Sequence, residues 1–263
     1  MTSLPSTGQP NLDAVAHGHY AEKQLHCKSS VIAFSHRARF LKALELVGAD
    51  PHGRLLDYGS GDGTFLSLLG SRFASSVGAD IAADQVADCR KRFSEVPNVT
   101  FCELRDLVAP EHLAAYKVVI CMEVLEHCPP SAVTSALGDM RRLVAPGGTV
   151  VISVPVETGL SFLLKSAVRT VAGWRRLSDY RHYERYSVGD ALRMTFATAR
   201  TRVNRPVYSG DGFDFHSHYG FNWRQIEEEV RKVMTVERIT FSPFTHLGGF
   251  LNSQAWMICR PRP

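Results

Sequence analysis

An acid followed by three evenly spaced glycines is the strongest chemical signal in this sequence. They lie in the segment LLDYGSGDGTF, residues 55–65, where Asp57 ends a short apolar run and Gly59, Gly61 and Gly63 follow. Glycine lets the backbone turn sharply and approach a ligand closely, because no side chain keeps the ligand away. A helical pattern follows this turn. The segment therefore predicts a strand, a tight loop and a helix that together bind a nucleotide-type cofactor.

The same segment departs from the two common phosphate-binding loops. A dinucleotide loop of the form G-x-G-x-x-G would need a glycine where the chain has Thr64. A P-loop would need Gly-Lys followed by Ser or Thr, which is absent here. A carboxylate at Asp57 would also repel phosphate and attract an ammonium group. The residues therefore favour a cofactor that carries an ammonium group, and the alternative is a tight turn without a ligand.

Further apolar runs predict the sheet that positions this loop. The run 76–80 ends on Asp80, about 20 residues beyond the first glycine, where an acid accepts hydrogen bonds from both ribose hydroxyls. We expect the following Ile81 to lie beside the cofactor as well. The run 117–127 begins as continuous apolar sequence, which is typical of a central parallel strand buried on both faces. Strands alternating with helices predict a doubly wound α/β sheet, whose ligand crevice lies at the carboxyl ends of its strands.

The pattern D-x-G-x-G-x-G resembles motif I of the class I S-adenosylmethionine-dependent methyltransferases. The resemblance covers residues 50–155 strongly and 235–260 in outline. It implies a seven-stranded, mostly parallel Rossmann-like sheet with an antiparallel last strand, and S-adenosylmethionine as the cofactor. It also implies that Asp106 hydrogen-bonds the adenine amino group and that Leu107 packs beside the adenine ring.

Two more segments resemble the quinone-pathway members of this family. SHRARF, residues 35–40, resembles an N-terminal helix in which an arginine meets the methionyl carboxylate, and Arg39 matches best, with Arg37 next. MEVLEHCPP resembles the MEVLEHV segment of the ubiquinone and menaquinone methyltransferases. There the segment borders both cofactor and acceptor, which implies that Met122 contacts the adenosyl moiety.

Histidines supply the proton chemistry that a hydroxyl acceptor needs. Methyl transfer is an in-line displacement at a sulfonium carbon, so the protein mainly positions donor and acceptor. A general base adds a factor of about 10²–10⁴ when the acceptor must lose a proton. His127 follows the fourth predicted strand, near the expected methyl group, and is the first catalytic candidate; its alternative role is a helix-start residue bonded to backbone. His182, in an aromatic-rich segment, is the second catalytic candidate.

A metal site is an alternative interpretation of the same residues. Glu123, Glu126 and His127 match the E-x-x-E-H pattern of the metal-dependent small-RNA 2′-O-methyltransferases and of some quinone O-methyltransferases, in which a divalent ion binds the acceptor hydroxyls. Two carboxylates and an imidazole are suitable ligands for such an ion. The candidates for a fourth ligand are His182, His216 and His218. Asn222 replaces the acid of the H-x-F-E-W segment of the RNA enzymes, so we favour a site without metal.

The sequence predicts five regions. They are a disordered tail (1–11), an N-terminal helical cap (12–49), a cofactor-binding core (50–156), an acceptor-binding insertion that forms a lid (157–230), and C-terminal strands that complete the sheet (231–263). The insertion opens with a basic amphipathic helix over residues 159–177. Such a helix packs on its own domain, covers an apolar acceptor or contacts a membrane surface.

Composition limits the partners and the compartment. The chain has 263 residues and a formal net charge of +4 without any block of like charge, so a nucleic-acid partner is not favoured. Its six cysteines form no C-x-x-C pair, which fits a reducing, cytoplasmic compartment. The N-terminus lacks the features of a signal peptide and no long apolar run occurs, so we expect at most peripheral membrane contact.

Together these features predict a methyltransferase that acts on a small or lipid-like acceptor, at oxygen. Two alternatives remain open at this stage. The first is a metal-dependent RNA ribose 2′-O-methyltransferase, against which the lack of a concentrated basic stripe counts. The second is a binding module that keeps the fold without catalysis.

Overall fold

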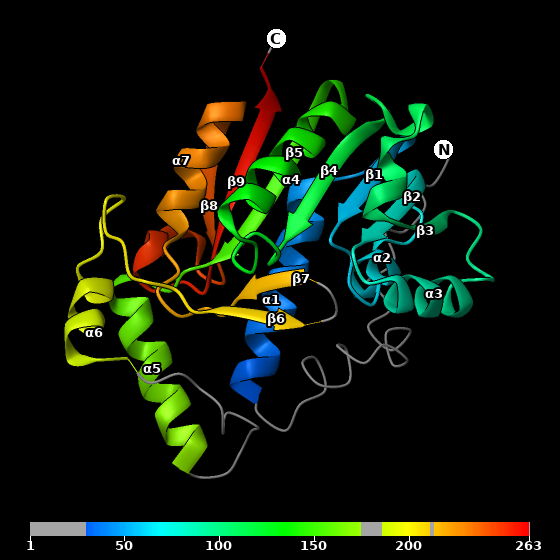
Figure 1. The fold of residues 1–263 in the computed structure, drawn as a ribbon. Coiled ribbons are helices and arrows are strands. Elements are labelled where there is room, and N and C mark those ends of the chain that lie inside the picture. Colours follow the sequence, from blue (N-terminus) through cyan, green and yellow to red (C-terminus); the bar gives the residue numbers. More distant parts are fainter. Residues whose placement is uncertain (1–29, 175–185, 211–212, 263) are drawn as a thin grey trace.

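The computed structural model describes residues 30–174, 186–210 and 213–262 and places one large sheet between two layers of helices (Figure 1). The strands of this sheet are β1 (Asp50–Tyr58), β2 (Phe73–Asp80), β3 (Val99–Glu103), β4 (Tyr116–Met122), β5 (Val144–Pro155), β8 (Met234–Ser242) and β9 (Gln254–Pro261). Their order is β3-β2-β1-β4-β5-β9-β8. The first five strands are parallel, and β9 is antiparallel to both of its neighbours. The predicted doubly wound, seven-stranded, mostly parallel sheet is confirmed.

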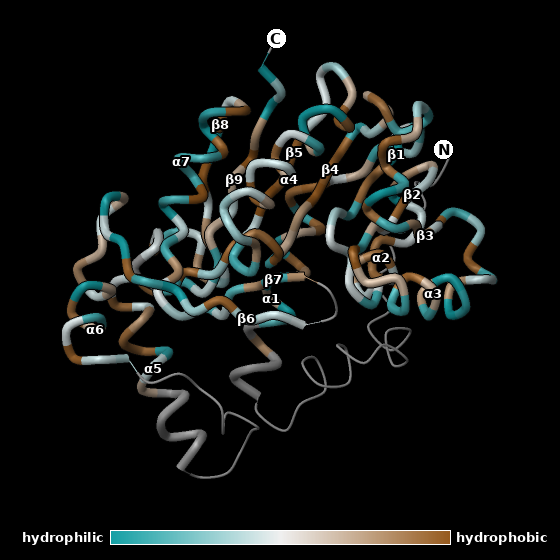
Figure 2. The backbone as a smooth tube through the Cα atoms, in the orientation of Figure 1, coloured by the Kyte–Doolittle hydropathy of each residue, from teal (hydrophilic) through white to brown (hydrophobic). Residues whose placement is uncertain are grey.

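Helices cover both faces of the sheet. One face packs against α1 (Ser30–Val47), α2 (Thr64–Leu69) and α3 (Ala83–Arg92), and the other packs against α4 (Pro130–Leu143) and α7 (Trp223–Val233). Alternate residues of β4 supply the two cores: Val118 and Ile120 face the first, while Val119 and Cys121 face the second. This two-sided burial is why the sequence of β4 is continuously apolar, as the hydropathy colouring in Figure 2 shows.

The segment between β5 and α7 lies beyond the carboxyl ends of the parallel strands (Figure 1). It contains α5 (Gly159–Trp174), α6 (Val188–Thr195) and a hairpin of β6 (Val207–Gly210) and β7 (Phe213–His216). Short 3₁₀ helices complete the described elements: η3 (Leu104–Val108), η4 (Pro110–His112) and η6 (Thr245–Phe250). Among the described helices, none combines the length and the apolar character that a bilayer span requires.

Some predictions fall on residues that the structure does not describe. These are the disordered tail (1–11), the part of the helical cap before residue 30, the end of the amphipathic helix and the catalytic candidate His182. The later part of the helical cap corresponds to α1, and the amphipathic helix corresponds to α5 in its described part. The predicted division into cap, core and insertion stays a proposal.

Candidate active site

A cavity of about 890 Å³ lies at the carboxyl ends of β1, β4 and β5. Its walls come from the glycine loop after β1, the loop after β4, the start of β9, helices α1 and α5, and the β6–β7 hairpin. Nine of the site residues that the sequence suggested line it: Arg39, Asp57, Gly59, Gly61, Met122, Glu123, Glu126, His127 and His218. The cavity therefore joins both halves of the predicted site, the cofactor loop and the segment that follows β4.

The loop between β1 and α2 requires glycine at two positions. Gly59 has φ +81°, and a Cβ atom there would lie 2.4 Å from a Val124 methyl carbon. Gly63 has φ +76°, and a Cβ atom there would lie 2.9 Å from the Phe101 ring. Gly61 differs, because a Cβ at its position meets no atom within 4 Å and would point into open space. The loop thus packs on the protein at two glycines and leaves the third open to a ligand.

Asp57, at the end of β1, lies in the cavity wall yet is only 1% exposed. Its Oδ1 accepts no hydrogen bond from the described residues. Burial, and then the negative charge of Asp80, raise the pKa of Asp57 to about 8. A buried carboxyl oxygen without a partner, beside an open glycine loop, fits a ligand that donates hydrogen bonds. The residues present therefore fit a cofactor that approaches the loop at Gly61 and donates a hydrogen bond to Asp57.

The other predicted cofactor residues lie at the edge of the cavity or outside it. Asp80 accepts hydrogen bonds from the Gly61 N–H (2.8 Å) and the Ala82 N–H (3.0 Å), so it supports the glycine loop. Ile81 is exposed and Leu107 packs in the core. Asp106 is exposed and caps η3. The roles of Asp106 and Leu107 beside adenine, and of Ile81, stay predictions.

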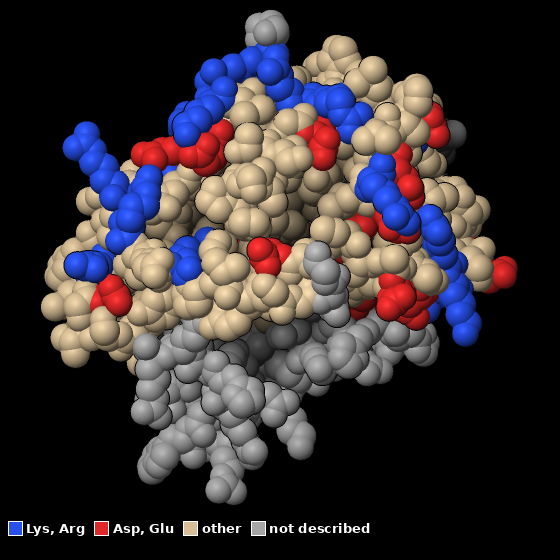
Figure 3. Space-filling view, in the orientation of Figure 1, with Lys and Arg blue, Asp and Glu red and all other residues tan. Residues whose placement is uncertain are grey.

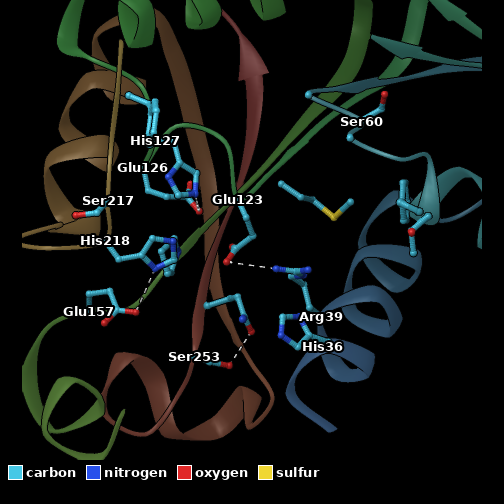
Figure 4. A pocket seen from close by; sticks show the side chains of 18 of the residues that line it. His36, Arg39, Ser60, Glu123, Glu126, His127, Glu157, Ser217, His218 and Ser253 are labelled. Carbon is cyan, nitrogen blue, oxygen red and sulfur yellow. Dashed lines mark hydrogen bonds and ion pairs between the residues drawn. The ribbon is translucent and has the colours of Figure 1, made fainter. Parts of the chain in front are cut away.

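Glu123 follows β4 with an unusual backbone. Its φ is +54°, which is rare for a residue other than glycine. Its Oε2 lies 3.5 Å from Nη1 of Arg39 on α1, and its Oε1 accepts a hydrogen bond from the Ser153 hydroxyl at 3.0 Å. Figure 4 shows Glu123 directed toward Arg39 and His36, with His127 and His218 on its other side.

On the other side of the cavity, Glu126, His127 and His218 converge (Figure 4). One ligand atom from each lies within 4.8 Å of the others, and this trio is the group among the described residues that could hold a metal ion. Glu126 is fully buried, and neither carboxylate oxygen is hydrogen-bonded to a described residue. Burial, and then Glu123, raise the pKa of Glu126 well above its usual value. The sequence-based metal set is thus modified: Glu123 faces Arg39, and His218 joins Glu126 and His127.

The His127 ring is oriented by backbone. Its Nδ1 lies 2.9 Å from the carbonyl oxygen of His216. Because a carbonyl only accepts, Nδ1 carries the hydrogen of the neutral ring and Nε2 has the free lone pair. Burial, and then the neighbouring His218, lower the pKa of His127, so the neutral ring is favoured at neutral pH. The ring is therefore arranged to accept a proton through Nε2.

Two charged residues of the site were missed by the sequence analysis. Glu157 follows β5, is 1% exposed, and lies 3.1 Å from Nζ of Lys165 and 3.6 Å from Nδ1 of His218. Lys165 on α5 also donates to the carbonyl oxygens of Val156 and Ser253. Glu157 could have been found from the sequence, because it is an acid at the carboxyl end of a predicted parallel strand. The same criterion identified Asp57.

Arg205 connects the insertion to the loop after β4. Its guanidinium donates hydrogen bonds to the carbonyl oxygens of Glu126, Ser217 (2.8 Å) and Tyr219 (3.3 Å). These carbonyls flank His127 on one segment and His218 on the other. One planar, five-donor side chain thus links the backbones that carry the two imidazoles.

Comparisons with known proteins agree with this geometry. A family model described as "Methyltransferase domain" matches residues 32–199. The chain is 26% identical to a "Ubiquinone biosynthesis O-methyltransferase" of Idiomarina loihiensis, over 70% of this chain and 74% of that protein. A protein of the same description from Paracidovorax citrulli is 34% identical over 42% of this chain and 47% of its own length, so that match spans about half of the relative.

Solved structures share the fold. A Pyrococcus horikoshii protein superposes with a TM-score of 0.58 at 17% identity, covering 92% of this chain and 98% of that one. The N-methyltransferase NodS from Bradyrhizobium japonicum, in complex with S-adenosyl-L-homocysteine, gives a TM-score of 0.56 at 12% identity, with 97% and 98% covered.

Proposed function

The chain belongs to the methyltransferase domain family and is a class I S-adenosylmethionine-dependent enzyme, and from this premise we propose that it methylates an oxygen atom of a small or lipid-like acceptor. S-adenosylmethionine supplies, when bound, a methyl group on a sulfonium centre. The observation that carries the proposal is the orientation of His127, which lines the cavity with its Nδ1 held by the His216 carbonyl, so that Nε2, 3.9 Å from Oε1 of Glu126, is left as the proton acceptor. The similarity to ubiquinone biosynthesis O-methyltransferases supports it.

In this proposal the acceptor hydroxyl lies beside His127. Nε2 takes the hydroxyl proton as the oxygen becomes a nucleophile, and the Nδ1 hydrogen bond to His216 holds the ring in place through that change. His218 and Glu157 complete the polar end of the cavity. Tyr208 and Phe215 of the hairpin, with ring centroids 5.8 Å apart, supply an aromatic wall for the rest of the acceptor.

Helix α5 is proposed as the lid. Lys165 fixes one face of α5 to the ends of β5 and β9, and to Glu157 in the cavity wall. Leu163 and Leu164 on the same helix are exposed. Exposed apolar residues on a helix beside the cavity suit a lipid-like acceptor or a peripheral contact with a membrane surface.

The test is an acceptor screen that follows S-adenosylhomocysteine formation. Phenols, catechols, alcohols and alkylamines are offered, with and without an isoprenoid tail, and the products are identified by mass spectrometry. We expect O-methylated products. His127→Gln should lower turnover by about 10²-fold or more while S-adenosylhomocysteine binding stays within about twofold. A screen that yields only methylated amines would contradict the proposal. An unchanged rate in His127→Gln would show that His127 is not the general base.

A second candidate, metal-dependent methylation of an RNA ribose hydroxyl, is favoured by one observation. Glu126, His127 and His218 converge, and Glu126 has two buried oxygens without hydrogen-bond partners from the described residues. These residues would hold a divalent ion, which would bind the acceptor hydroxyls. On the face seen in Figure 3, however, the basic residues gather along the upper edge, at the end opposite the carboxyl ends of the parallel strands, and only isolated basic residues lie lower on that face, so this candidate ranks second.

Metal removal separates the two candidates. The proposed function predicts that EDTA leaves the rate with a small acceptor unchanged. The second candidate predicts that EDTA abolishes methylation of a short RNA duplex and that Mg²⁺ or Mn²⁺ restores it. His218→Ala would then eliminate the metal-dependent part of the activity.

A further inference from the structure

A buried ion pair in the cavity wall has no part in the proton chemistry above. Nη1 of Arg39 lies 3.5 Å from Oε2 of Glu123, with side chains 9% and 16% exposed. Both residues line the cavity, Arg39 from α1 and Glu123 from the end of β4. In the view of Figure 4, Glu123 lies between Arg39 on one side and the Glu126, His127 and His218 trio on the other, and its carboxylate meets Arg39.

Glu123 is held firmly in this position. Its backbone N–H donates to the Ser153 carbonyl at 3.0 Å, and the Ser153 hydroxyl donates to its Oε1 at 3.0 Å. The left-handed backbone, φ +54°, turns the side chain out of the line of β4. A non-glycine residue persists in this conformation only where its surroundings enforce it, and such positions concentrate at ligand sites. The carboxylate is therefore fixed beside Arg39 by two contacts to β5.

The charges of this pair are complementary to an α-amino acid. The methionyl end of S-adenosylmethionine carries an ammonium and a carboxylate on one carbon atom. A guanidinium and a carboxylate at 3.5 Å present opposite charges at a similar spacing. We propose that Glu123 binds the methionyl ammonium group of S-adenosylmethionine, beside the carboxylate that the family resemblance assigns to Arg39. The four charges then alternate in sign around a closed ring, so each is compensated after losing its water.

Two other carboxyl groups are less suited to the ammonium. Asp57 is fully buried under the glycine loop, next to Asp80, and its pKa is raised to about 8 by burial, so the free protein holds it neutral at neutral pH. Glu126 lies with the histidines on the far side. Glu123 already has a cation beside it in the cavity. The ammonium preference that the sequence suggested for Asp57 is therefore reassigned to Glu123.

The test uses three ligands that differ only at the amino-acid end. S-adenosylhomocysteine carries both charges, S-adenosyl-3-thiopropylamine lacks the carboxylate, and S-adenosyl-4-thiobutyrate lacks the ammonium. Calorimetry with EDTA present measures each against wild type, Glu123→Gln and Arg39→Gln. We expect Glu123→Gln to weaken S-adenosylhomocysteine binding by about 10- to 100-fold, yet to change binding of the thiobutyrate by less than about threefold. Arg39→Gln should show the reverse pattern, with the thiopropylamine little affected.

Control variants keep the result decisive. Glu126→Gln removes a neighbouring buried carboxyl and should leave the ratio of the two affinities unchanged, while Glu123→Asp keeps the charge and should retain part of the ammonium preference. Equal weakening of S-adenosylhomocysteine and the thiobutyrate by Glu123→Gln would overturn the proposal, as would no weakening of either. An ammonium-specific loss in Asp57→Asn alone would assign the group to Asp57. None of these measurements needs an acceptor, so their failure is separate from failure of the proposed O-methylation.

Discussion

Asp80 supports the glycine loop, and its predicted second role is to bind the ribose of the cofactor. Its two oxygens accept hydrogen bonds from the Gly61 and Ala82 N–H groups, so it fixes the open glycine of the loop and the start of α3. A ribose diol at the same carboxylate would add charge-assisted hydrogen bonds. This double role means that a substitution affects both the shape of the loop and the affinity for the cofactor.

We predict that Asp80→Asn weakens S-adenosylhomocysteine binding by about 1–3 kcal/mol, because an amide keeps the shape but loses the charge and one acceptor. Calorimetry measures the change. Asp84→Asn is the matched control, since Asp84 is an exposed acid four residues later, in the first turn of α3. If both variants bind as wild type does, Asp80 does not contact the cofactor.

Asp57 gives the free protein a pH-dependent stability. Its folded pKa, about 8, lies above the unfolded value of 3.8, so between these limits the folded state holds a proton that the unfolded chain has released. The stabilisation is complete below pH 3.8 and is lost as the pH rises through about 8. Asp57→Asn should therefore melt progressively higher than wild type as the pH is raised from about 6 to about 9. Melting curves without cofactor check this, and parallel pH dependences in the two proteins would contradict it.

At the scale of elements, the loop between β1 and α2 depends on a close approach to the segment after β4. Gly59 has φ +81°, and a Cβ atom added to it would lie 2.4 Å from a methyl carbon of Val124. Gly48 has a similar φ of +66°, but a Cβ atom added there would meet no atom within 4 Å. Alanine at either position costs about 1–2 kcal/mol of backbone strain. Gly59→Ala adds a steric clash of about 1–3 kcal/mol, so it should melt several degrees below Gly48→Ala. Equal melting temperatures would show that the loop moves away without cost.

Arg205 links the insertion to the loop after β4 through hydrogen bonds to backbone carbonyls. A lysine would keep the charge but offers a single nitrogen where the guanidinium serves three carbonyl oxygens. Arg205→Lys should therefore lower stability by about 1–3 kcal/mol, with S-adenosylhomocysteine affinity unchanged within about twofold. Arg202→Lys, which alters an exposed arginine of the same segment, should change neither quantity. A large loss of cofactor affinity in Arg205→Lys would place Arg205 in the cofactor site instead.

In the molecule as a whole, the sequence was sufficient to predict the sheet and to bring the glycine-loop residues to one end of it. A glycine turn after one apolar run and an acid after the next predict parallel strands, and parallel strands bring their carboxyl ends to one edge. Asp57, Gly59, Gly61 and Met122 meet in the cavity for that reason. The resemblance supplied Arg39, which lies on a helix that no strand pattern would place over this edge.

The arrangement of the cavity residues around His127 could not be predicted from the sequence, because it depends on contacts between segments that are far apart in the chain. His127 and the carbonyl of His216 are 89 residues apart in the chain and meet only because the β6–β7 hairpin folds back over the sheet. Glu123 and Glu126 share one motif, but the positive φ of Glu123 directs it to Arg39 on the opposite side. The sequence motif suggests that Glu123 and Glu126 bind the same metal ion. In the structure, Glu123 pairs with Arg39, and Glu126 lies with His127 and His218.

The proposed reaction transfers a methyl group from S-adenosylmethionine to an oxygen atom of the acceptor. The most direct measurement is to supply S-adenosylmethionine labelled with ¹³C in the methyl group, together with the best acceptor from the screen, and to identify by NMR the atom that carries the label. We expect a methyl carbon bonded to oxygen, formed at a rate that falls by about 10²-fold in His127→Gln. A label bonded to nitrogen or carbon, at a rate independent of His127, would contradict it.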